Sequence, residues 1–239
     1  MDDGNLLGKL GLGDFIEFVF PSLCLVCDQY IEPSGELICP DCWGKAIDSP
    51  IALCSNCMGV MPESLKCPHC SPPDSIPILA LGHYVDPLKK IIHQFKYYGY
   101  KKLSAALGNH LIAKYLPALE KADGDCIVPI PLDHFREKTR GFNQAAVLSD
   151  IISKRLNILS AQGNLVKRAK TKDQTRLDPR QRIENMKGAF AVQGDTLLAK
   201  RVILMDDVVT TGATLREAMK VILESGAKPV LALVVAATD

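Results

Sequence analysis

Four C-x-x-C pairs in the first third of the chain constrain its fold more than any other feature. They account for eight of its nine cysteines: Cys24, Cys27, Cys39, Cys42, Cys54, Cys57, Cys67 and Cys70. Each pair presents two thiolates from one tight turn, and two such knuckles complete a tetrahedral Zn²⁺ site. The pairs are separated by 11, 11 and 9 residues, so the eight ligands can hold two zinc ions. Sequential pairing of the knuckles is the simplest arrangement, although an interleaved pairing also fits the spacing.

These zinc sites are expected to be structural, because four thiolates leave no open position on the ion for water or substrate. A segment as short as residues 21–72 buries too little apolar surface to fold alone, so the metal must supply much of its stability. Redox-active dithiols and an iron–sulfur cluster are the alternative interpretations of the same spacing. His69 is expected to be a bystander, because the cysteines complete the coordination. The ninth cysteine, Cys126, lies in an apolar run and is expected to be a buried thiol.

The overall composition indicates an ordinary globular protein. The chain has 239 residues, 47% of them hydrophobic, and a formal net charge of +1. This fits one medium domain plus a small module. A balanced charge gives no whole-surface attraction to nucleic acid or membranes, so any such binding must come from a local patch.

A cytoplasmic location with no transmembrane segment is predicted. The N-terminus, with Asp2 and Asp3, lacks the positive region of a secretory signal. The longest apolar stretch, Val230–Ala237, is too short to span a bilayer. In a reducing compartment, paired cysteines are metal ligands more often than disulfides.

Three regions are predicted along the chain. Residues 1–20 form a helix with an apolar face, residues 21–72 form the zinc module, and residues 78–239 form the main domain after a proline-rich linker. Strands are expected at 79–84, 125–130, 190–192, 201–205 and 229–236, and helices at 87–95, 102–116, 143–156 and 214–225. Strands that alternate with helices predict an α/β fold: a Rossmann-like, mostly parallel sheet covered on both faces.

Residues 201–214 carry the strongest functional signal in the main domain. An apolar strand ends in two adjacent acids, Asp206 and Asp207, and a Thr-Thr-Gly-Ala-Thr loop then opens a helix. Ligands of open α/β sheets bind at the carboxyl ends of strands. A loop of small residues before a helix lets backbone amides and hydroxyls surround a phosphate, which the helix dipole favours. The plainer alternative is a solvated turn, with Thr214 as a simple helix cap.

This stretch resembles the phosphoribosyl pyrophosphate signature of type I phosphoribosyltransferases. The resemblance implies that Asp206 and Asp207 contact the ribose hydroxyls. It also implies that the loop holds the ribose phosphate, through Val209, Thr210, Thr211, Gly212, Ala213 and Thr214. The family usually requires Mg²⁺, a hard cation that suits a diphosphate and oxygen ligands.

Further motifs resemble the ComF family of competence-associated proteins. They include Val128-Pro-Ile-Pro131-Leu, Arg136, Arg140-Gly-Phe-Asn-Gln144, Phe95-Lys-Tyr-Tyr98 and Gly188-Ala-Phe190. An N-terminal double zinc ribbon belongs to the same pattern, and the resemblance covers residues 21–239. It implies a type I phosphoribosyltransferase domain, a role in DNA uptake, and single-stranded DNA or other competence proteins as partners.

Several of these segments also make sense beside a diphosphate. Pro129-Ile-Pro131 follows a strand and can form a tight turn, with a cis bond as one option, that directs backbone groups at pyrophosphate. Arg136 and Arg140 follow it as candidate ligands, or else they form a solvated helix face.

Residues 167–187 hold eight basic residues against three acidic ones. Such a loop can fold over pyrophosphate and exclude water, with Arg168 and Arg176 as candidate catalytic residues. It can equally follow the phosphates of a single strand, or be a polar loop without a ligand.

Two functions follow from these features. The first is a Mg²⁺-dependent transfer of phosphoribose to an unidentified acceptor, in which the loop arginines and lysines position the substrate and neutralise charge. Asp206, Asp207 or the acceptor itself would then supply the general base. The second is a non-catalytic competence factor that uses the same scaffold to handle single-stranded DNA. A regulator that senses phosphoribosyl pyrophosphate is a third, weaker interpretation.

Overall fold

A computed structural model describes residues 21–32, 35–72, 75–97, 102–168 and 186–238. The strands are β1 (Ile51–Cys54), β2 (Pro77–His83), β3 (Cys126–Pro129), β4 (Leu159–Ser160), β5 (Leu165–Lys167), β6 (Phe190–Val192), β7 (Arg201–Val209) and β8 (Lys228–Ala237). The helices are α2 (Pro40–Ala46), α3 (Leu88–Tyr97), α4 (Lys102–Ala122), α5 (His134–Arg140), α6 (Gln144–Leu156) and α8 (Ala213–Glu224).

Six of the strands form one sheet in the order β1-β2-β8-β7-β3-β4. All neighbours in it are parallel except β1, which runs antiparallel to β2. The central strands β7 and β8 are long apolar runs because both of their faces are covered. The predicted α/β fold class, with a mostly parallel sheet, is confirmed.

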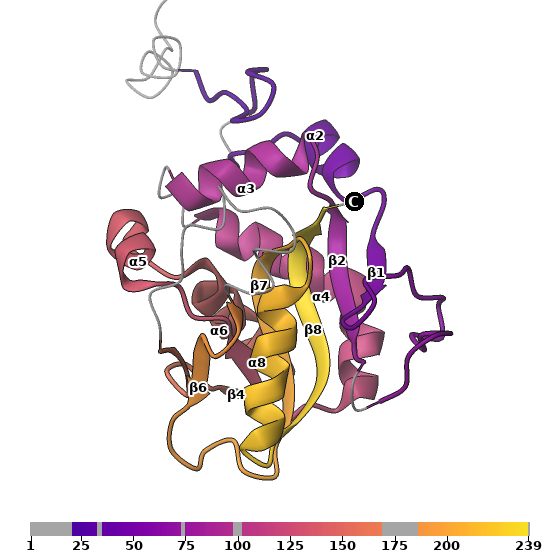
Figure 1. The fold of residues 1–239 in the computed structure, drawn as a ribbon. Helices are drawn as coiled ribbons and strands as arrows, with labels where there is room; N and C mark the ends of the chain where they lie inside the picture. Colours follow the sequence, from indigo (N-terminus) through magenta and orange to yellow (C-terminus); the bar gives the residue numbers. More distant parts are fainter. Residues whose placement is uncertain (1–20, 33–34, 73–74, 98–101, 169–185, 239) are drawn as a thin grey trace, which may run out of the picture.

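The two faces of the sheet have separate apolar cores. Ile203 and Met205 of β7 pack with α3, α4 and α6. In Figure 1, α4 and α6 lie behind the sheet and α3 lies above it. Val202 and Leu204, which alternate with them along the strand, pack with α8 in front of the sheet. The hairpin β5–β6 covers this second face beside α8.

The connections define a topological switch point between β3 and β7. After β3, the chain passes through α5 and α6 to β4 at one edge of the sheet. After β7, it passes through α8, on the opposite face, to β8 on the other side. The two crossovers diverge where the carboxyl ends of β3 and β7 meet, and ligands of open α/β sheets bind at such points.

The zinc-binding segment shares both the sheet and the core of the main domain. Strand β1 lies inside this segment, and it pairs Ile51 with Ala80 and Cys54 with Pro77 of β2. Trp43 of α2 is buried in the core behind the sheet.

Some predicted elements differ from the observed ones. Helix α4 continues to Ala122 through Pro117, because buried Leu119 extends its packed face beyond the proline. Strand β7 continues to Val209, so the two acids lie within the strand rather than after it, since hydrogen bonds to β8 extend that far.

A cis bond was one option for the Pro129-Ile-Pro131 turn, and this option is wrong. Among the described residues, the cis peptide bond is found at Asp86–Pro87 instead. The predicted helix at 1–20 and most of the basic loop, residues 169–185, lie outside the described residues. Within the described part of the chain, no helix combines the length and apolarity needed to cross a membrane.

Candidate functional site

The eight paired cysteines form two clusters, and sequential pairing is confirmed. Site 1 comprises Cys24, Cys27, Cys39 and Cys42, and site 2 comprises Cys54, Cys57, Cys67 and Cys70. The sulfur atoms of each cluster lie within 4.8 Å of one another. One sulfur–sulfur distance in each, Cys27–Cys39 and Cys57–Cys67, is 3.7 Å. Tetrahedral Zn–S bonds of about 2.3 Å place neighbouring sulfurs about 3.8 Å apart, so both clusters fit Zn²⁺.

Backbone amides donate hydrogen bonds to cysteine sulfurs in both clusters. In site 1, the amide of Cys42 donates to Cys39 Sγ at 3.4 Å, where Cys39 caps the N-terminus of α2. In site 2, the amide of His69 donates to Cys67 Sγ at 3.5 Å. This hydrogen bond lowers the pKa of Cys67 to about 7. His69 belongs to neither cluster, as predicted, and it contributes through its backbone.

The two zinc sites differ in burial. Three cysteines of site 1 are buried within the core that contains α3. In site 2, Cys54 is buried at the end of β1, but Cys57 is exposed and the remaining two ligands are half-buried. Cys126 is also buried, as predicted, and burial raises the pKa of its thiol to about 11.

The two adjacent acids lie on β7 at the switch point, directly after Met205. Their charged neighbours differ: Asp207 forms ion pairs with Lys96 and Arg140, whereas Lys96 and Lys167 act on Asp206 through their charge.

Two cations hold the carboxylate of Asp207. Lys96 Nζ, near the end of α3, lies 2.7 Å from Asp207 Oδ2, and Arg140 Nη1 lies 4.0 Å from the same oxygen. All three side chains are less than 15% exposed. Arg140 also donates to Gln144 Oε1 at 3.2 Å and to the Tyr97 hydroxyl at 3.3 Å. The three elements α3, α5 and α6 therefore fix the position of this acid.

Asp206 is partly shielded from solvent and titrates near neutrality. Burial, followed by the charge of Asp207, raises its pKa to about 7. The amide of Asp207 donates to Asp206 Oδ1 at 2.7 Å, and this bond and the charges of Lys96 and Lys167 act in the opposite direction. At neutral pH, Asp206 can therefore both donate and accept a proton.

The proline turn after β3 lies directly beside the acids. The parallel register pairs Pro129 with Met205, and the amide of Ile130 donates to the Met205 carbonyl at 2.8 Å. Asn143, which caps α6, donates from Nδ2 to the Ile130 carbonyl at 3.0 Å. Pro131 then leads into α5, so the turn is fixed between the switch point and the first turn of α6.

Two further cations gather at Asp133, the N-cap of α5. Arg136 Nε lies 3.4 Å from Asp133 Oδ2, and Lys167 Nζ, from β5, lies 3.8 Å from it. Burial lowers the pKa of Lys167, while the charge of Asp133 opposes that change. This cluster gives the switch point a second group of positive charges, on the side of Asp206.

The loop between β7 and α8 presents free backbone donors. Gly212 has a φ of +70°, the left-handed conformation that glycine adopts without strain. The amide of Ala213 donates weakly to Thr211 Oγ1, at 3.4 Å. The amides of Thr210, Thr211 and Gly212 donate to no acceptor among the described residues. Three open donors thus precede the N-terminus of a twelve-residue helix.

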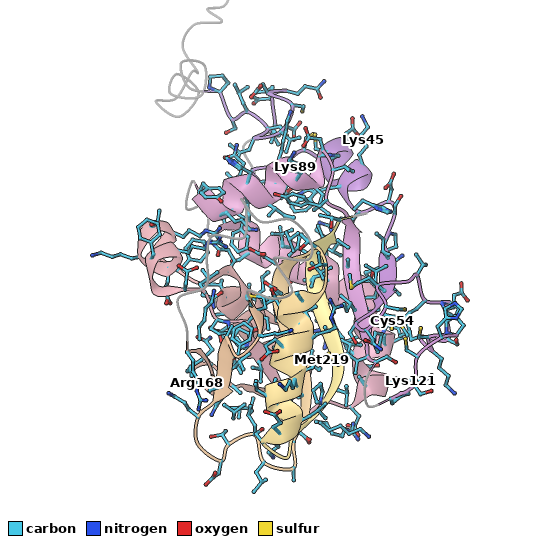
Figure 2. The ribbon with its side chains drawn as sticks, in the orientation of Figure 1. Lys45, Cys54, Lys89, Lys121, Arg168 and Met219 are labelled. Atoms are coloured by element: carbon cyan, nitrogen blue, oxygen red, sulfur yellow. The ribbon has the colours of Figure 1, made fainter. Side chains whose placement is uncertain are left out.

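The structure brings most of the predicted contact residues to the switch point: both acids, the loop through Thr214, both prolines, Arg136 and Arg140. Arg168 is exposed just beyond β5 (Figure 2), and Arg176 lies outside the described residues. The sequence analysis placed Lys167 only as one member of the basic segment 167–187 that can fold over pyrophosphate, and it did not place Lys96 at the site. Nothing local distinguished Lys167 from the other basic residues of that segment.

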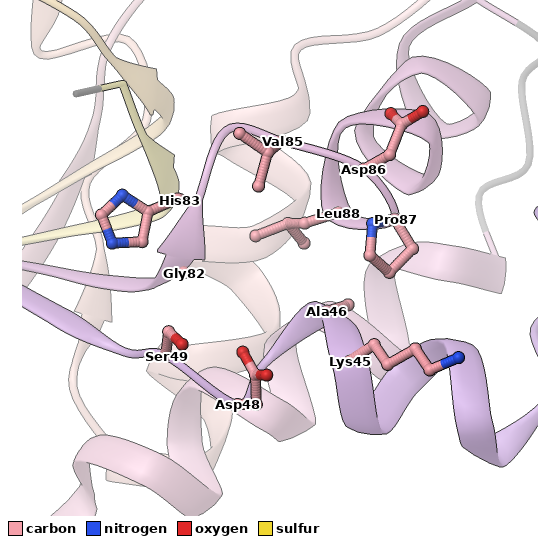
Figure 3. Close-up of a pocket in the computed structure, with 10 residues that line it drawn as sticks. All are labelled: Lys45, Ala46, Asp48, Ser49, Gly82, His83, Val85, Asp86, Pro87 and Leu88. Atoms are coloured by element: carbon pink, nitrogen blue, oxygen red, sulfur yellow. The ribbon is translucent and has the colours of Figure 1, made fainter.

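A small cavity lies elsewhere, at the carboxyl end of β2. It measures about 80 Å³ and is lined by α2, the segment after it and the β2–α3 turn (Figure 3). At Gly82, an added Cβ would lie 2.9 Å from the Ala46 carbonyl oxygen, so the two backbones almost touch. Pockets for drug-sized ligands occupy about 300–1,000 Å³, so this cavity is too small for a sugar diphosphate.

Comparison with known proteins agrees with this architecture. Residues 15–73 match a family described as the double zinc ribbon domain. The chain is 32% identical to "Competence protein F" of Haemophilus influenzae over 214 residues, 80% of this chain and 93% of that protein. It is 30% identical to "DNA utilization protein YhgH" of Escherichia coli K12 over 217 residues, 88% of this chain and 94% of that protein. The chain belongs to the ComF family.

A more distant relative supports the same assignment. "Competence protein ComFC" of Streptococcus pneumoniae is 26% identical over 216 residues, 87% of this chain and 84% of that protein. All three alignments cover most of both chains.

The zinc sites predict distinct losses on substitution. The purified chain is expected to hold two equivalents of zinc, one for each cysteine cluster. Cys42→Ser and Cys70→Ser should each hold one, and Cys42→Ser should lower the free energy of unfolding more, because Cys42 lies in the core. Metal analysis and urea denaturation test this, with Cys126→Ala as the control that retains both ions. Two equivalents in either serine variant would contradict the assignment.

The raised pKa of Asp206 predicts a pH-dependent stability. Its ordinary value is 3.8, and the folded value is about 7. Between these values the folded chain holds a proton that the unfolded chain lacks, so stability falls as pH rises. The free energy of unfolding of wild type, relative to Asp206→Asn, should therefore decrease from about pH 4 to 7 and stay level above. Urea denaturation at several pH values measures this difference, and a pH-independent difference would refute it.

Proposed function

We propose that this ComF-family chain binds phosphoribosyl pyrophosphate with Mg²⁺ at the switch point and transfers phosphoribose to an acceptor. One observation carries the proposal: two adjacent carboxylates on β7 are followed, two strand residues later, by a loop before α8 whose amides at Thr210–Gly212 have no acceptor among the described residues. A phosphorylated sugar needs both features, acceptors for its hydroxyls and donors for its phosphate.

The acids suit the ribose. Ionised carboxylates accept hydrogen bonds from hydroxyl groups, and charge-assisted bonds of this kind are short and strong. Asp207 is held in place by Lys96 and Arg140, so its ordering precedes ligand binding. Asp206, with a pKa of about 7, is suited to take a proton from an acceptor at neutral pH.

The loop suits the ribose phosphate. The amides of Thr210, Thr211 and Gly212 are available, and Thr210 and Thr214 add hydroxyl groups to the same loop. The N-terminus of α8 has no side-chain cap, so its partial positive charge faces the loop. Backbone amides and a helix terminus together form the usual protein site for a phosphate group.

The pyrophosphate belongs beside the β3 turn. Pro129-Ile-Pro131 lies next to the acids, and Arg136, Arg140 and Lys167 supply positive charge at the switch point. These cations would balance the charge that develops on the leaving group as the bond to the anomeric carbon breaks. Arg168 and Arg176 remain predicted contributors from the basic segment.

The same edge of the sheet suits Mg²⁺. Carboxylate and phosphate oxygens are the ligands that this cation prefers, and Asp206 and Asp207 are the carboxylates nearest the proposed diphosphate. When bound, Mg²⁺ would neutralise diphosphate charge and improve it as a leaving group. The chain's own residues supply orientation and the remaining charge.

We propose that the reaction or the bound ligand serves DNA uptake or use. The named relatives are competence and DNA utilization proteins. The second candidate, a non-catalytic factor for single-stranded DNA, is favoured by Tyr97, which is 56% exposed. Its ring lies 4.7 Å from that of His93 and 5.1 Å from the Arg140 guanidinium carbon. Exposed aromatic rings beside arginine stack on unpaired bases.

Calorimetry with phosphoribosyl pyrophosphate and Mg²⁺ tests the main proposal. Wild type should bind, and Asp206→Asn and Asp207→Asn should each weaken binding by about 10- to 100-fold, because each removes a charged hydrogen-bond acceptor. Glu224→Gln, an exposed acid at the end of α8, is the matched control and should bind as wild type does. A pyrophosphate-release screen over bases, nucleosides and amines then identifies the acceptor.

Binding measurements with phosphoribosyl pyrophosphate and with single-stranded DNA distinguish the two candidate functions. If wild type ignores phosphoribosyl pyrophosphate but binds single-stranded DNA with steep salt dependence, the scaffold is a DNA-binding module. Tyr97→Ala should then weaken DNA binding, whereas the two Asn variants should not.

A further inference from the structure

The second zinc site touches the phosphate loop through one arginine. Arg216 lies in the first turn of α8, and its Nη2 donates to the Thr211 carbonyl at 2.7 Å. Its Nη1 donates to two carbonyls of the Cys54–Cys57 knuckle, those of Ser55 at 3.1 Å and Asn56 at 3.2 Å. One guanidinium thus joins a loop of site 2 to the loop that follows β7.

Van der Waals contact reinforces this bridge. A Cβ placed on Gly212 would lie 2.5 Å from Met58 Sδ and 2.9 Å from Arg216 Nη1. Met58 directly follows the second knuckle cysteine, and its amide donates to the Cys54 carbonyl at 2.8 Å. The knuckle therefore presses against Gly212, and no side chain fits between them.

The geometry requires arginine rather than any cation. The planar guanidinium donates in fixed directions, here toward the knuckle on one side and the loop on the other. A lysine keeps the charge but lacks this fork. The acceptors are backbone carbonyls, so the contact fixes main-chain positions and would be lost if the knuckle changed its fold.

We propose that Arg216 is a positioning residue that couples the zinc ion of site 2 to phosphate binding at Thr210–Gly212. Zinc fixes the knuckle, the knuckle carbonyls hold Arg216, and Arg216 holds the Thr211 carbonyl so that the adjoining amides point toward a phosphate. Loss of zinc from site 2 then weakens binding of a phosphorylated ribose without any change in the acids. The identity of the ligand in this coupling rests on the proposed function. The Arg216 contact itself is separate from zinc coordination, which the cysteines complete without it.

The first test replaces the bridge while the zinc ligands stay intact. Arg216→Met should retain both zinc ions and the wild-type thermal midpoint within a few degrees, yet bind phosphoribosyl pyrophosphate and ribose 5-phosphate about tenfold more weakly. Arg216→Lys should bind as weakly as Arg216→Met, because charge without the fork does not hold the loop. Lys220→Met, on the exposed face of the same helix, should bind as wild type does.

The second test removes the metal. Cys67→Ser with Cys70→Ser should lose one zinc ion and weaken ribose 5-phosphate binding to the same extent as Arg216→Met. Combining the cysteine and arginine changes should add little, because both act on one contact. Wild-type affinity in Arg216→Met, or fully additive losses, would overturn the coupling.

Amide hydrogen exchange, measured without ligand, tests the coupling independently of the proposed function. Exchange at the amides of Ala213 and residue 216, whose acceptors Thr211 Oγ1 and the Gly212 carbonyl belong to the loop, should quicken in Arg216→Met and in the double cysteine variant, relative to Lys220→Met, with no ligand present. If wild type binds no phosphorylated ribose but exchange quickens as described, the ligand assignment fails and the coupling stands. If wild type binds and exchange is unchanged in both variants, the coupling fails alone.

Discussion

The parallel pairing of β3 with β7 is the interaction on which the candidate site depends. Its register places Pro129 opposite Met205, one residue before the two acids. The crossovers that leave these strands cover opposite faces, so the pair also marks the point where the sheet opens. The proline turn and the acids with their phosphate loop come from segments about 75 residues apart in the chain, and this one ladder of hydrogen bonds aligns them.

The two acids have different charged neighbours. Asp207 forms ion pairs with Lys96 and Arg140, whereas the charges of Lys96 and Lys167 act on Asp206. The two neighbouring carboxylates therefore have different environments, and burial raises the pKa of Asp206 to about 7. Two acids with different proton affinities can bind the same sugar while only one exchanges protons near neutrality.

The zinc-binding segment is part of the same body as the sheet. Site 1 is packed into the core behind the sheet, and strand β1, which ends at the site 2 ligand Cys54, adds an edge strand to the sheet. Such contacts suit a module that cannot bury a core of its own. They also bring a zinc knuckle to the start of α8, which is why a structural metal can influence a ligand site without touching the ligand.

The parts of the fold and site that could be predicted from the sequence are those formed by residues close together in the chain. The knuckle spacing predicted two clusters of four cysteines, and the strand–acid–loop–helix pattern of residues 201–214 predicted the local structure of the candidate site. Contacts between distant segments carry no such signal. Lys96 pairs with Asp207, and Lys167 pairs with Asp133 near Asp206, only because the fold brings α3 and β5 to the switch point. Arg216 resembles any helix-surface arginine until the knuckle is packed against it. The cis bond considered for the proline turn does not occur there. The turn, with trans bonds, brings the Ile130 amide to the Met205 carbonyl.

A crystal structure of the chain with Mg²⁺ and phosphoribosyl pyrophosphate would show whether the sugar diphosphate binds at the switch point. We expect the ribose hydroxyls within hydrogen-bond distance of Asp206 and Asp207, the 5-phosphate on the amides of Thr210–Gly212, and the pyrophosphate beside Pro129–Pro131. A ligand bound away from the carboxyl ends of β3 and β7, with the loop amides turned to protein acceptors, would contradict this expectation.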